Sequence, residues 1–428
     1  MLTLRSAEPR RILHVVGDSR FGGAGRIILR LGEVAKAEGW EVDILTTDGI
    51  FQREVRQHGL GLVNLDVIRR PIRPLWDLAG LVRLCGFLRR ERYAIVHTHT
   101  SKAGFVGRLA ARLAGIPAII HTVHGFAFHE ASPFSVRLLY TALERTASRW
   151  CDRIVSVSEF HRLWALELRI CDTSKIVAIP NGIAALPKPE LAPGVLRRVL
   201  GIREQEFLIL SMSRLARDKG LEHLIDAAAI LTRYETCFKV VIAGDGPIRA
   251  QLEERVRDLG VADRVVFVGF REDIADLLAA SDLIVLPSLR EGLSIALLEA
   301  MAAGRAIVAT SIGSHRELAS QAKIAWLVPP SDPNALCGSI LEAARNPEQM
   351  LRYGTNARAL FESYYTEDRM LSSYQQLYSE LLEQKCSAKT DGGAPPTQIR
   401  CGKGSGNASK HDGPQIVYQF RQPKGGRS

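Results

Sequence analysis

Two glutamates stand eight positions apart in REGLSIALLEAMAAG, residues 290–304. Glu299 sits among side chains that are apolar on nearly every face of a helix, and such a helix is normally buried. Burial without a partner costs about 2–7 kcal/mol even for a merely polar group, so this carboxylate needs hydrogen-bond donors. Vicinal hydroxyls of a ribose would supply them, whereas an arginine or a neighbouring helix end is the commoner partner. Glu291 precedes the helix, and Ser294 is its expected N-cap.

The stretch SRLARDKG, residues 213–220, places Arg214 and Lys219 on either side of a turn that opens a helix. Two cations there could hold a diphosphate and neutralise the charge that grows as it leaves a substrate. Solvated surface charges of this kind are also common in loops, so the pattern alone leaves both interpretations open.

Glycine-rich turns follow expected strands at two further places, FGGAG (21–25) and AGDGP (243–247). Gly22 and Gly23 would let backbone N–H groups approach an anion beside a helix N-terminus. Gly244 could shape a nucleotide pocket. Structural turns are the alternative in both cases. FGGAG also lacks the Gly-x-Gly-x-x-Gly spacing of a dinucleotide-binding oxidoreductase, which weighs against that class.

Histidines at positions 97, 99, 121, 124 and 129 suggest a metal site at first sight. His97 and His99 would share one face of a strand, because side chains two positions apart point the same way. No carboxylate stands close by before Glu130. Structural hydrogen bonding is therefore the preferred interpretation, and no metal site is predicted.

Hydrophobic patterning predicts the scaffold that positions these motifs. Short apolar runs alternate with stretches of helical spacing, as in parallel sheets covered by helices on both faces. The first series of expected strands comprises 11–17, 41–47, 94–100, 118–125 and 153–159, with helices at 25–38, 75–90, 101–114 and 133–149. The second series comprises 207–215, 239–246, 264–270, 283–288, 306–310 and 325–329. Ligands of such sheets bind beyond the carboxyl ends of the strands, where the four loop motifs fall.

The seam between two doubly wound domains is expected at residues 180–194, which are dense in proline and glycine. We predict an N-terminal, acceptor-side domain over residues 1–190 and a C-terminal, nucleotide-sugar-binding domain over 191–365. A last helix over 366–385 should return to the first domain. Residues 386–428 are dominated by glycine, proline, serine and lysine, and this composition predicts a disordered tail.

Composition and charge narrow the class of protein. The sequence is 46% hydrophobic and 24% charged, and no apolar run approaches the ~20 residues that span a bilayer, so a globular cytoplasmic protein is expected. Seven scattered cysteines without a Cys-x-x-Cys motif argue against a disulfide framework. The net charge of +10 is concentrated before residue 191 and after residue 385. A basic surface favours an anionic membrane or a phosphorylated ligand, and no nucleic-acid-binding motif accompanies it.

Taken in order, Arg214 with Lys219, AGDGP and the Glu291-x7-Glu299 pair resemble family 4 of the retaining glycosyltransferases. The resemblance covers about residues 10–385. It implies the GT-B fold, an α/β architecture in which two doubly wound Rossmann-like domains face each other across a cleft, with parallel sheets. It also implies hexosyl transfer from a nucleotide-diphosphate-sugar with retention of anomeric configuration. No essential metal and no cofactor beyond the UDP- or GDP-sugar substrate are implied.

The resemblance carries roles to individual residues of the C-terminal half. Glu299 matches the glutamate that binds the ribose, and Glu291 matches the one that approaches the transferred sugar. Arg214 and Lys219 match the diphosphate-binding pair. No residue is an obvious covalent nucleophile, which agrees with a front-face mechanism in which the leaving diphosphate helps to deprotonate the acceptor.

Further roles follow for the loops of both halves. Gly22 and Gly23 match a loop near the distal phosphate, and His124 in HTVHG matches a histidine near the donor sugar and the reaction centre. The family's usual Glu-Gly-Phe-Gly is here continued after Glu291 by Gly292, Leu293 and Ser294. Backbone donors to the sugar can survive this change, but the sugar preference becomes open.

The segment over residues 69–92 joins a helix carrying leucine, valine, phenylalanine and tryptophan to arginines at both ends. It is either an ordinary helix packed on the first sheet or an interfacial surface that docks on anionic lipid. Docking would suit a lipid-linked acceptor, and HTVHGFAFH resembles enzymes that build bacterial surface polysaccharides. The expected acceptor is therefore a glycan or a polyprenyl-diphosphate-linked sugar, with peripheral attachment to the inner face of the plasma membrane. A nucleotide-sugar epimerase of the same fold and a noncatalytic sugar- or lipid-binding protein are the alternatives.

Overall fold

Apolar runs rich in valine, isoleucine and leucine form two all-parallel sheets in the computed structural model, which describes residues 10–390 except 70, 72, 235 and 236. The strands of the first sheet are β1 (Arg11–Gly17), β2 (Glu41–Thr46), β3 (Gly61–Val63), β4 (Ile95–His99), β5 (Ala118–Val123), β6 (Arg153–Ser156) and β7 (Ile176–Ala178). The second sheet contains β8 (Phe207–Met212), β9 (Phe238–Ala243), β10 (Val265–Gly269), β11 (Leu283–Leu286), β12 (Ala306–Thr310) and β13 (Ala325–Val328).

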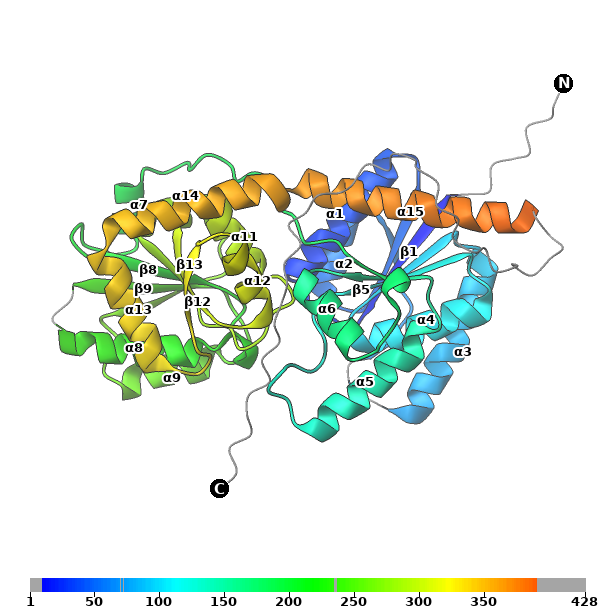
Figure 1. The fold of residues 1–428 in the computed structure, drawn as a ribbon, viewed down its shortest axis with the longest axis horizontal. Helices are drawn as coiled ribbons and strands as arrows, with labels where there is room; N and C mark the ends of the chain where they lie inside the picture. Colours follow the sequence, from blue (N-terminus) through cyan, green and yellow to red (C-terminus); the bar gives the residue numbers. More distant parts are fainter. Residues whose placement is uncertain (1–9, 70, 72, 235–236, 391–428) are drawn as a thin grey trace, which may run out of the picture.

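The strand order is β3-β2-β1-β4-β5-β6-β7 in the first sheet and β10-β9-β8-β11-β12-β13 in the second. Each order reverses direction beside the strand that starts its domain, at β1/β4 and at β8/β11, which defines the doubly wound topology. The expected pair of Rossmann-like domains is thereby confirmed, and Figure 1 shows them side by side.

Helices connect the strands and cover both faces of each sheet. The first domain contains α1 (Gly23–Ala37), α2 (Gly49–Gln57), α3 (Pro74–Glu91), α4 (Ser101–Ala114), α5 (Phe134–Ser148) and α6 (Glu159–Glu167). The second contains α7 (Pro193–Val199), α8 (Leu221–Leu231), α9 (Arg249–Asp258), α10 (Ile274–Ala280), α11 (Ile295–Ala302), α12 (Gly313–Gln321), α13 (Pro333–Arg345) and α14 (Pro347–Tyr364). Of the described helices, none combines the length and the apolar character that crossing a bilayer requires.

The last helix, α15 (Glu367–Thr390), leaves the second domain and packs on the first, as Figure 1 shows. Met370, Tyr374, Leu377 and Leu381 recur at helical spacing and are buried in the same apolar cluster as Ile12 of β1. This helix extends to Thr390, beyond the end expected near residue 385, while residues 391–428, most of the predicted tail, lie outside the described part of the chain.

Two crossings of the chain join the domains, and they lie side by side. Ile183 N donates to Tyr365 O at 3.2 Å, and Glu367 N donates to Ile183 O at 2.9 Å. At Gly182 a Cβ would lie 2.2 Å from Thr366 O, so this close approach requires glycine. The linker after β7 and the α14–α15 junction therefore form one hydrogen-bonded connection.

Candidate functional site

The two domains touch where the loop after β5 meets the turn before α11. A Cβ on Gly292 would lie 2.0 Å from His124 O, so only glycine permits this contact. Asn181 Nδ2, from the linker, donates to Leu293 O at 3.1 Å. The Leu293 side chain is buried in the core of the second domain, so it offers a ligand only its backbone. Ser294 caps α11 by accepting a hydrogen bond from Leu297 N.

Glu291 lies at this contact and is held by two side chains. Lys219 Nζ donates to Glu291 Oε1 at 2.5 Å, and Ser288 Oγ donates to the same oxygen at 2.9 Å. Lys219 and Glu291 keep only 17% and 12% of their side-chain area exposed, so the pair is poorly solvated. Lys219 ends a short 3₁₀ turn, and Gly220 follows it in the left-handed region with φ +61°, where a Cβ would lie 2.2 Å from Pro287 O. The turn after β8 is thus pressed against the loop after β11.

Glu299, the lone carboxylate of the apolar helix α11, meets an arginine from the other domain. Arg26 Nη1 lies 3.4 Å from Glu299 Oε1, and the Glu299 side chain is 12% exposed. Burial raises the pKa of Glu299, while the Arg26 charge acts in the opposite direction. The arginine partner considered for this helical glutamate is therefore present, half-exposed on α1.

The first turn of α1 packs against the start of α11. A Cβ on Gly23 would lie 2.8 Å from Ile295 Cγ1, whereas one on Gly22 would meet open space. Gly22 is the N-cap residue of α1, has extended backbone and provides no side-chain cap. Backbone N–H groups at a helix start carry partial positive charge, so this turn suits an anion.

Gly244 supports the turn that carries Arg214. It has φ +138°, and a Cβ there would lie 1.9 Å from Ser213 O, so glycine is required for the close packing of two strand ends. Arg214 is 40% exposed and lies 3.6 Å from Asp218 in an ion pair. Its guanidinium stands beside the turn that ends at Lys219.

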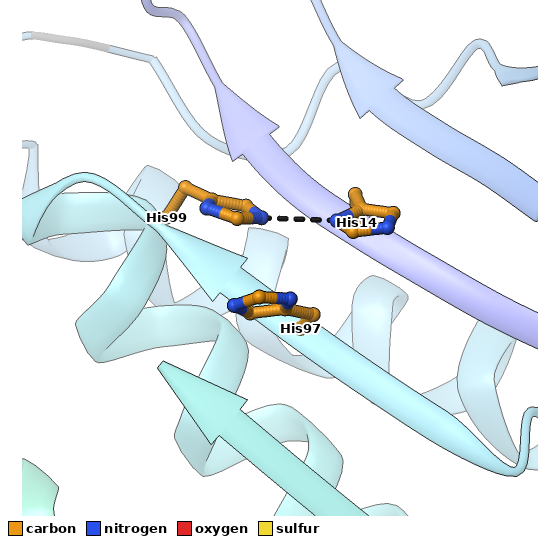
Figure 2. A group of neighbouring side chains, drawn as sticks. All are labelled: His14, His97 and His99. Atoms are coloured by element: carbon orange, nitrogen blue, oxygen red, sulfur yellow. Dashed lines mark hydrogen bonds between the residues drawn. The ribbon is translucent and has the colours of Figure 1, made fainter. Parts of the chain in front are cut away.

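Buried histidines extend from this site into the first sheet. His124 Nε2 lies 3.1 Å from His99 Nδ1, and His99 Nε2 lies 3.0 Å from His14 Nδ1. His97 binds elsewhere, to Tyr378 Oη at 2.8 Å and to Thr122 Oγ1 at 2.7 Å. Figure 2 shows the rings of His14, His97 and His99 on neighbouring strands, with the His14–His99 bond dashed.

Three of these rings come close enough to raise the metal question again. Potential ligand atoms of His14, His97 and His99 lie within 4.8 Å of one another. Both nitrogens of His97 are already in hydrogen bonds, and this set of three contains no carboxylate or thiolate to offset a buried divalent charge. The donor set fits a hydrogen-bonded network better than a metal centre, and the expectation of no metal stays a prediction.

Several residues around Glu291 and Glu299 were not anticipated from the sequence. Ser288 carries a readable signal, since it is a polar side chain at the end of the strand expected over residues 283–288. His315 donates from Nδ1 to Thr310 O at 2.9 Å, and burial lowers its pKa against the pull of Glu291. Arg26 stands four positions after Gly22 on a helix, but nothing in the sequence relates it to Glu299.

A second contact between the domains involves a buried acid. Glu317 of α12 accepts hydrogen bonds from Glu159 N at 3.1 Å and Phe160 N at 2.8 Å, at the start of α6. Burial raises the pKa of Glu317 from 4.5 to about 7, although these two bonds act to lower it.

We expect Glu317 to make the stability of the protein depend on pH. The pKa of Glu317 in the folded protein lies above its ordinary value, so the protonated acid stabilises the fold relative to the charged form. This contribution to the free energy of unfolding is complete below about pH 4.5 and is lost as the pH rises through about 7. Glu317→Gln mimics the protonated acid, so its melting temperature should match that of the wild type near pH 5 and exceed it at pH 8.5. Parallel melting curves across this range, with equal differences at every pH, would contradict the assignment.

Comparison with known proteins agrees with this arrangement. Residues 22–182 match the "Glycosyl transferase 4-like domain" model, and residues 195–360 match "Glycosyl transferases group 1". The chain is 30% identical to the Escherichia coli UDP-Gal:alpha-D-GlcNAc-diphosphoundecaprenol alpha-1,3-galactosyltransferase, over 88% of this chain and 98% of the relative. It is 29% identical to the putative glycosyltransferase EpsD of Bacillus subtilis, over 83% and 93% of the two chains.

Solved structures agree on the fold. The chain superposes on Anabaena HepE in complex with UDP and glucose with a TM-score of 0.74, at 22% identity, over 87% of this chain and all of that one. The Escherichia coli and Bacillus subtilis relatives are both named as transferases, and neither supports the epimerase alternative. The sequence matches, the two parallel-sheet domains and the motifs gathered between them together place this chain in the group 1 family of glycosyltransferases, with the GT-B fold.

Proposed function

We propose that this chain is a retaining, metal-independent glycosyltransferase that moves a hexosyl group from a UDP- or GDP-sugar to a glycan or polyprenyl-diphosphate-linked acceptor. The observation that carries the proposal is the Lys219–Glu291 pair, held beside the His124 loop by the close contact at Gly292. A cation and a carboxylate of the second domain thereby meet the backbone of the His124 loop of the first domain. UDP is the preferred nucleotide, because the Escherichia coli relative is named for UDP-Gal and the Anabaena structure holds UDP.

Residues of both domains would hold the donor. Glu299 would accept hydrogen bonds from the ribose hydroxyls. Arg214 and Lys219 would bind the diphosphate, and the N–H groups after Gly22 would face its distal phosphate. Glu291 and the backbone of Gly292 would orient the sugar. Cations that neutralise the departing diphosphate can replace a metal ion in this role.

The reaction would proceed on one face of the sugar. The acceptor hydroxyl oxygen forms a bond to C1 as the bond from C1 to the β-phosphate oxygen breaks. The hydroxyl proton passes to the leaving diphosphate, so that the new glycosidic bond keeps the configuration of the old one. The protein contributes position and charge stabilisation, and no covalent enzyme intermediate is formed.

The decisive experiment is transfer from UDP-galactose and UDP-glucose to a GlcNAc-diphosphate-polyprenol in excess chelator, followed by NMR of the anomeric proton. We expect release of UDP that depends on the acceptor, and a product with an α linkage. Inversion of configuration, or activity that returns only with added divalent metal, would contradict the mechanism.

Contact with a membrane surface would explain the exposed apolar side chains and arginines on the outer helices of the first domain. The helix α4 packs against both α3 and α5, and Figure 1 shows the three helices together. α3 buries Leu84 and Leu88 against the domain, so it is both an ordinary packed helix and a carrier of exposed apolar residues. The most exposed apolar side chains of α3 and α5, which define the α3–α5 face, are Leu75, Leu78, Val82, Phe134, Leu138 and Leu139. The exposed arginines of these helices and their ends are Arg83, Arg89, Arg90, Arg112, Arg145 and Arg149.

Helices that carry both exposed apolar side chains and exposed arginines suit an anionic bilayer. We assign the α3–α5 face to the inner face of the plasma membrane, where a lipid-linked acceptor would be presented. The stripe on α5 was not foreseen, since only the segment over residues 69–92 was considered from the sequence.

Vesicle binding tests this surface. Phe134→Ser with Leu138→Ser should weaken binding to vesicles of phosphatidylglycerol and phosphatidylcholine at least tenfold, since burying one such side chain contributes about 1.5–3 kcal/mol. Leu351→Ser with Phe270→Ser, at similarly exposed positions of the second domain, is the matched control and should bind as the wild type does. Binding that ignores lipid charge and salt, or an equal loss in the control, would exclude this surface.

A further inference from the structure

A line of three histidines connects the proposed reaction centre to the middle of the first sheet. His14 of β1 and His99 of β4 are fully buried, and His124 follows β5 at the domain contact. Burial lowers the pKa of His14 to about 3 and that of His124 to about 4, and it lowers the pKa of His99 well below its ordinary value. All three rings are therefore neutral at physiological pH.

Because the three rings are neutral and hydrogen-bonded in series, the position of the proton on one ring fixes its position on the next. A neutral imidazole has one N–H donor and one acceptor nitrogen, so His99 must donate to one neighbour and accept from the other. If His99 Nδ1 donates to His124 Nε2, the proton of His124 is on its Nδ1. If His124 Nε2 donates instead, its Nδ1 is an acceptor. The state of His99 thus decides what His124 Nδ1 can do.

The ends of the line differ from its middle. Within the described part of the chain, His124 Nδ1 and His14 Nε2 are buried atoms without a hydrogen-bond partner, whereas both nitrogens of His99 are used. The rings of His99 and His124 are also stacked, with centroids 5.3 Å apart, so a change at His99 would release the ring of His124.

We propose that His99, with His14 behind it, is a positioning residue that holds His124 in one orientation and one tautomer. The Nδ1 of His124 then presents a fixed donor or acceptor to the substrate bound between the domains. This inference rests on the proposed function, which places His124 at the reaction centre. The partner of one imidazole nitrogen commonly sets the state of the other, so His99 controls the reaction without touching the substrate.

His97 provides a matched control from the same strand. It is as buried as His99 and lies against it, with ring centroids 4.3 Å apart. Its two hydrogen bonds go to Thr122 and to Tyr378 of α15, and neither reaches His124. A variant of His97 therefore loses similar buried contacts but leaves the line of three intact.

The test compares His99→Leu, His99→Asn and His97→Gln. His99→Leu should lower kcat about 10- to 30-fold, with the KM for donor and the Kd for UDP unchanged within about threefold. Asparagine can place its amide near the former Nδ1, so His99→Asn should recover most of kcat. In ¹⁵N-histidine NMR, His124 should show one tautomer in the wild type and in His97→Gln, and a mixture in His99→Leu.

The spectrum requires no substrate, so it tests positioning separately from the proposed transfer reaction. An unchanged His124 signal in folded His99→Leu would overturn the inference, and so would an equal loss of kcat in His97→Gln. Stoichiometric zinc in the purified protein that His97→Gln removes would also overturn it, because a metal would then orient the rings.

Discussion

Replacing Lys219 with alanine should lower kcat about 100- to 1,000-fold, the loss typical when one preorganised donor to developing charge is removed. In the proposed reaction, negative charge grows on the diphosphate as the bond to C1 breaks, and Lys219 is a partly buried cation whose charge is weakly screened. Its other task is to hold Glu291 through the 2.5 Å contact. The variant therefore loses both charge stabilisation and the orientation of Glu291.

Two further variants test whether the effect depends on the charge and on the position of Lys219. Lys219→Arg keeps the charge and should retain more activity than the alanine variant. Arg217→Ala removes an exposed cation from the same 3₁₀ turn and should stay within about twofold of the wild type. Steady-state rates with saturating donor and acceptor provide the measurement. A folded Lys219→Ala variant whose kcat stays within threefold of the wild type would show that this lysine does not stabilise the leaving diphosphate.

Glu299→Ala should raise the Kd for UDP about 30- to 100-fold, or ~2–3 kcal/mol, the usual range for hydrogen bonds to a charged group. Inside the apolar helix α11 the carboxylate is 12% exposed, so bonds from ribose hydroxyls would form away from competing water. Isothermal titration with UDP measures the effect directly.

Arg26 provides a test of the alternative role for Glu299, in which its ion pair with Arg26 only joins the two domains. In that case Arg26→Ala would weaken UDP binding as much as Glu299→Ala does. We instead expect less than a fivefold effect from Arg26→Ala. We also expect 2′,3′-dideoxy-UDP to bind the wild type and Glu299→Ala with similar low affinity. This ligand lacks the ribose hydroxyls that Glu299 would bind.

Much of the fold could be predicted from periodicity, and the failures have a common physical origin. The helix expected over residues 101–114 is observed with these bounds, because its small and apolar residues repeat at helical spacing and Gly115 ends it. In the first domain two short helices were missed, α2 and α6. Their start signals, Asp48 and Ser158, are genuine side-chain caps, but each helix has only nine residues and shows few apolar repeats.

The candidate site was less accessible to sequence reasoning. Motif spacing predicted Glu291 and Lys219 as site residues, and the structure places them in contact. The sequence could not relate Arg26 to Glu299, which are 273 positions apart, or Asn181 to Leu293, which are 112 apart. Such pairs depend on how two folded domains meet. Likewise, strand alternation put His97 and His99 on one face, but only the β1–β4 pairing brings in His14.

The return of α15 has a consequence for the order in which this protein is made. The last helix to cover the first sheet, α15, follows the second domain in the sequence. Its Tyr378 hydrogen-bonds His97 and is synthesised long after β4. While the ribosome is still translating the second domain, the nascent first domain therefore carries an uncovered apolar face and a His97 ring without its native tyrosine partner. We expect it to be a chaperone client at that stage and to become resistant to protease only when residues beyond Leu381 have left the exit tunnel.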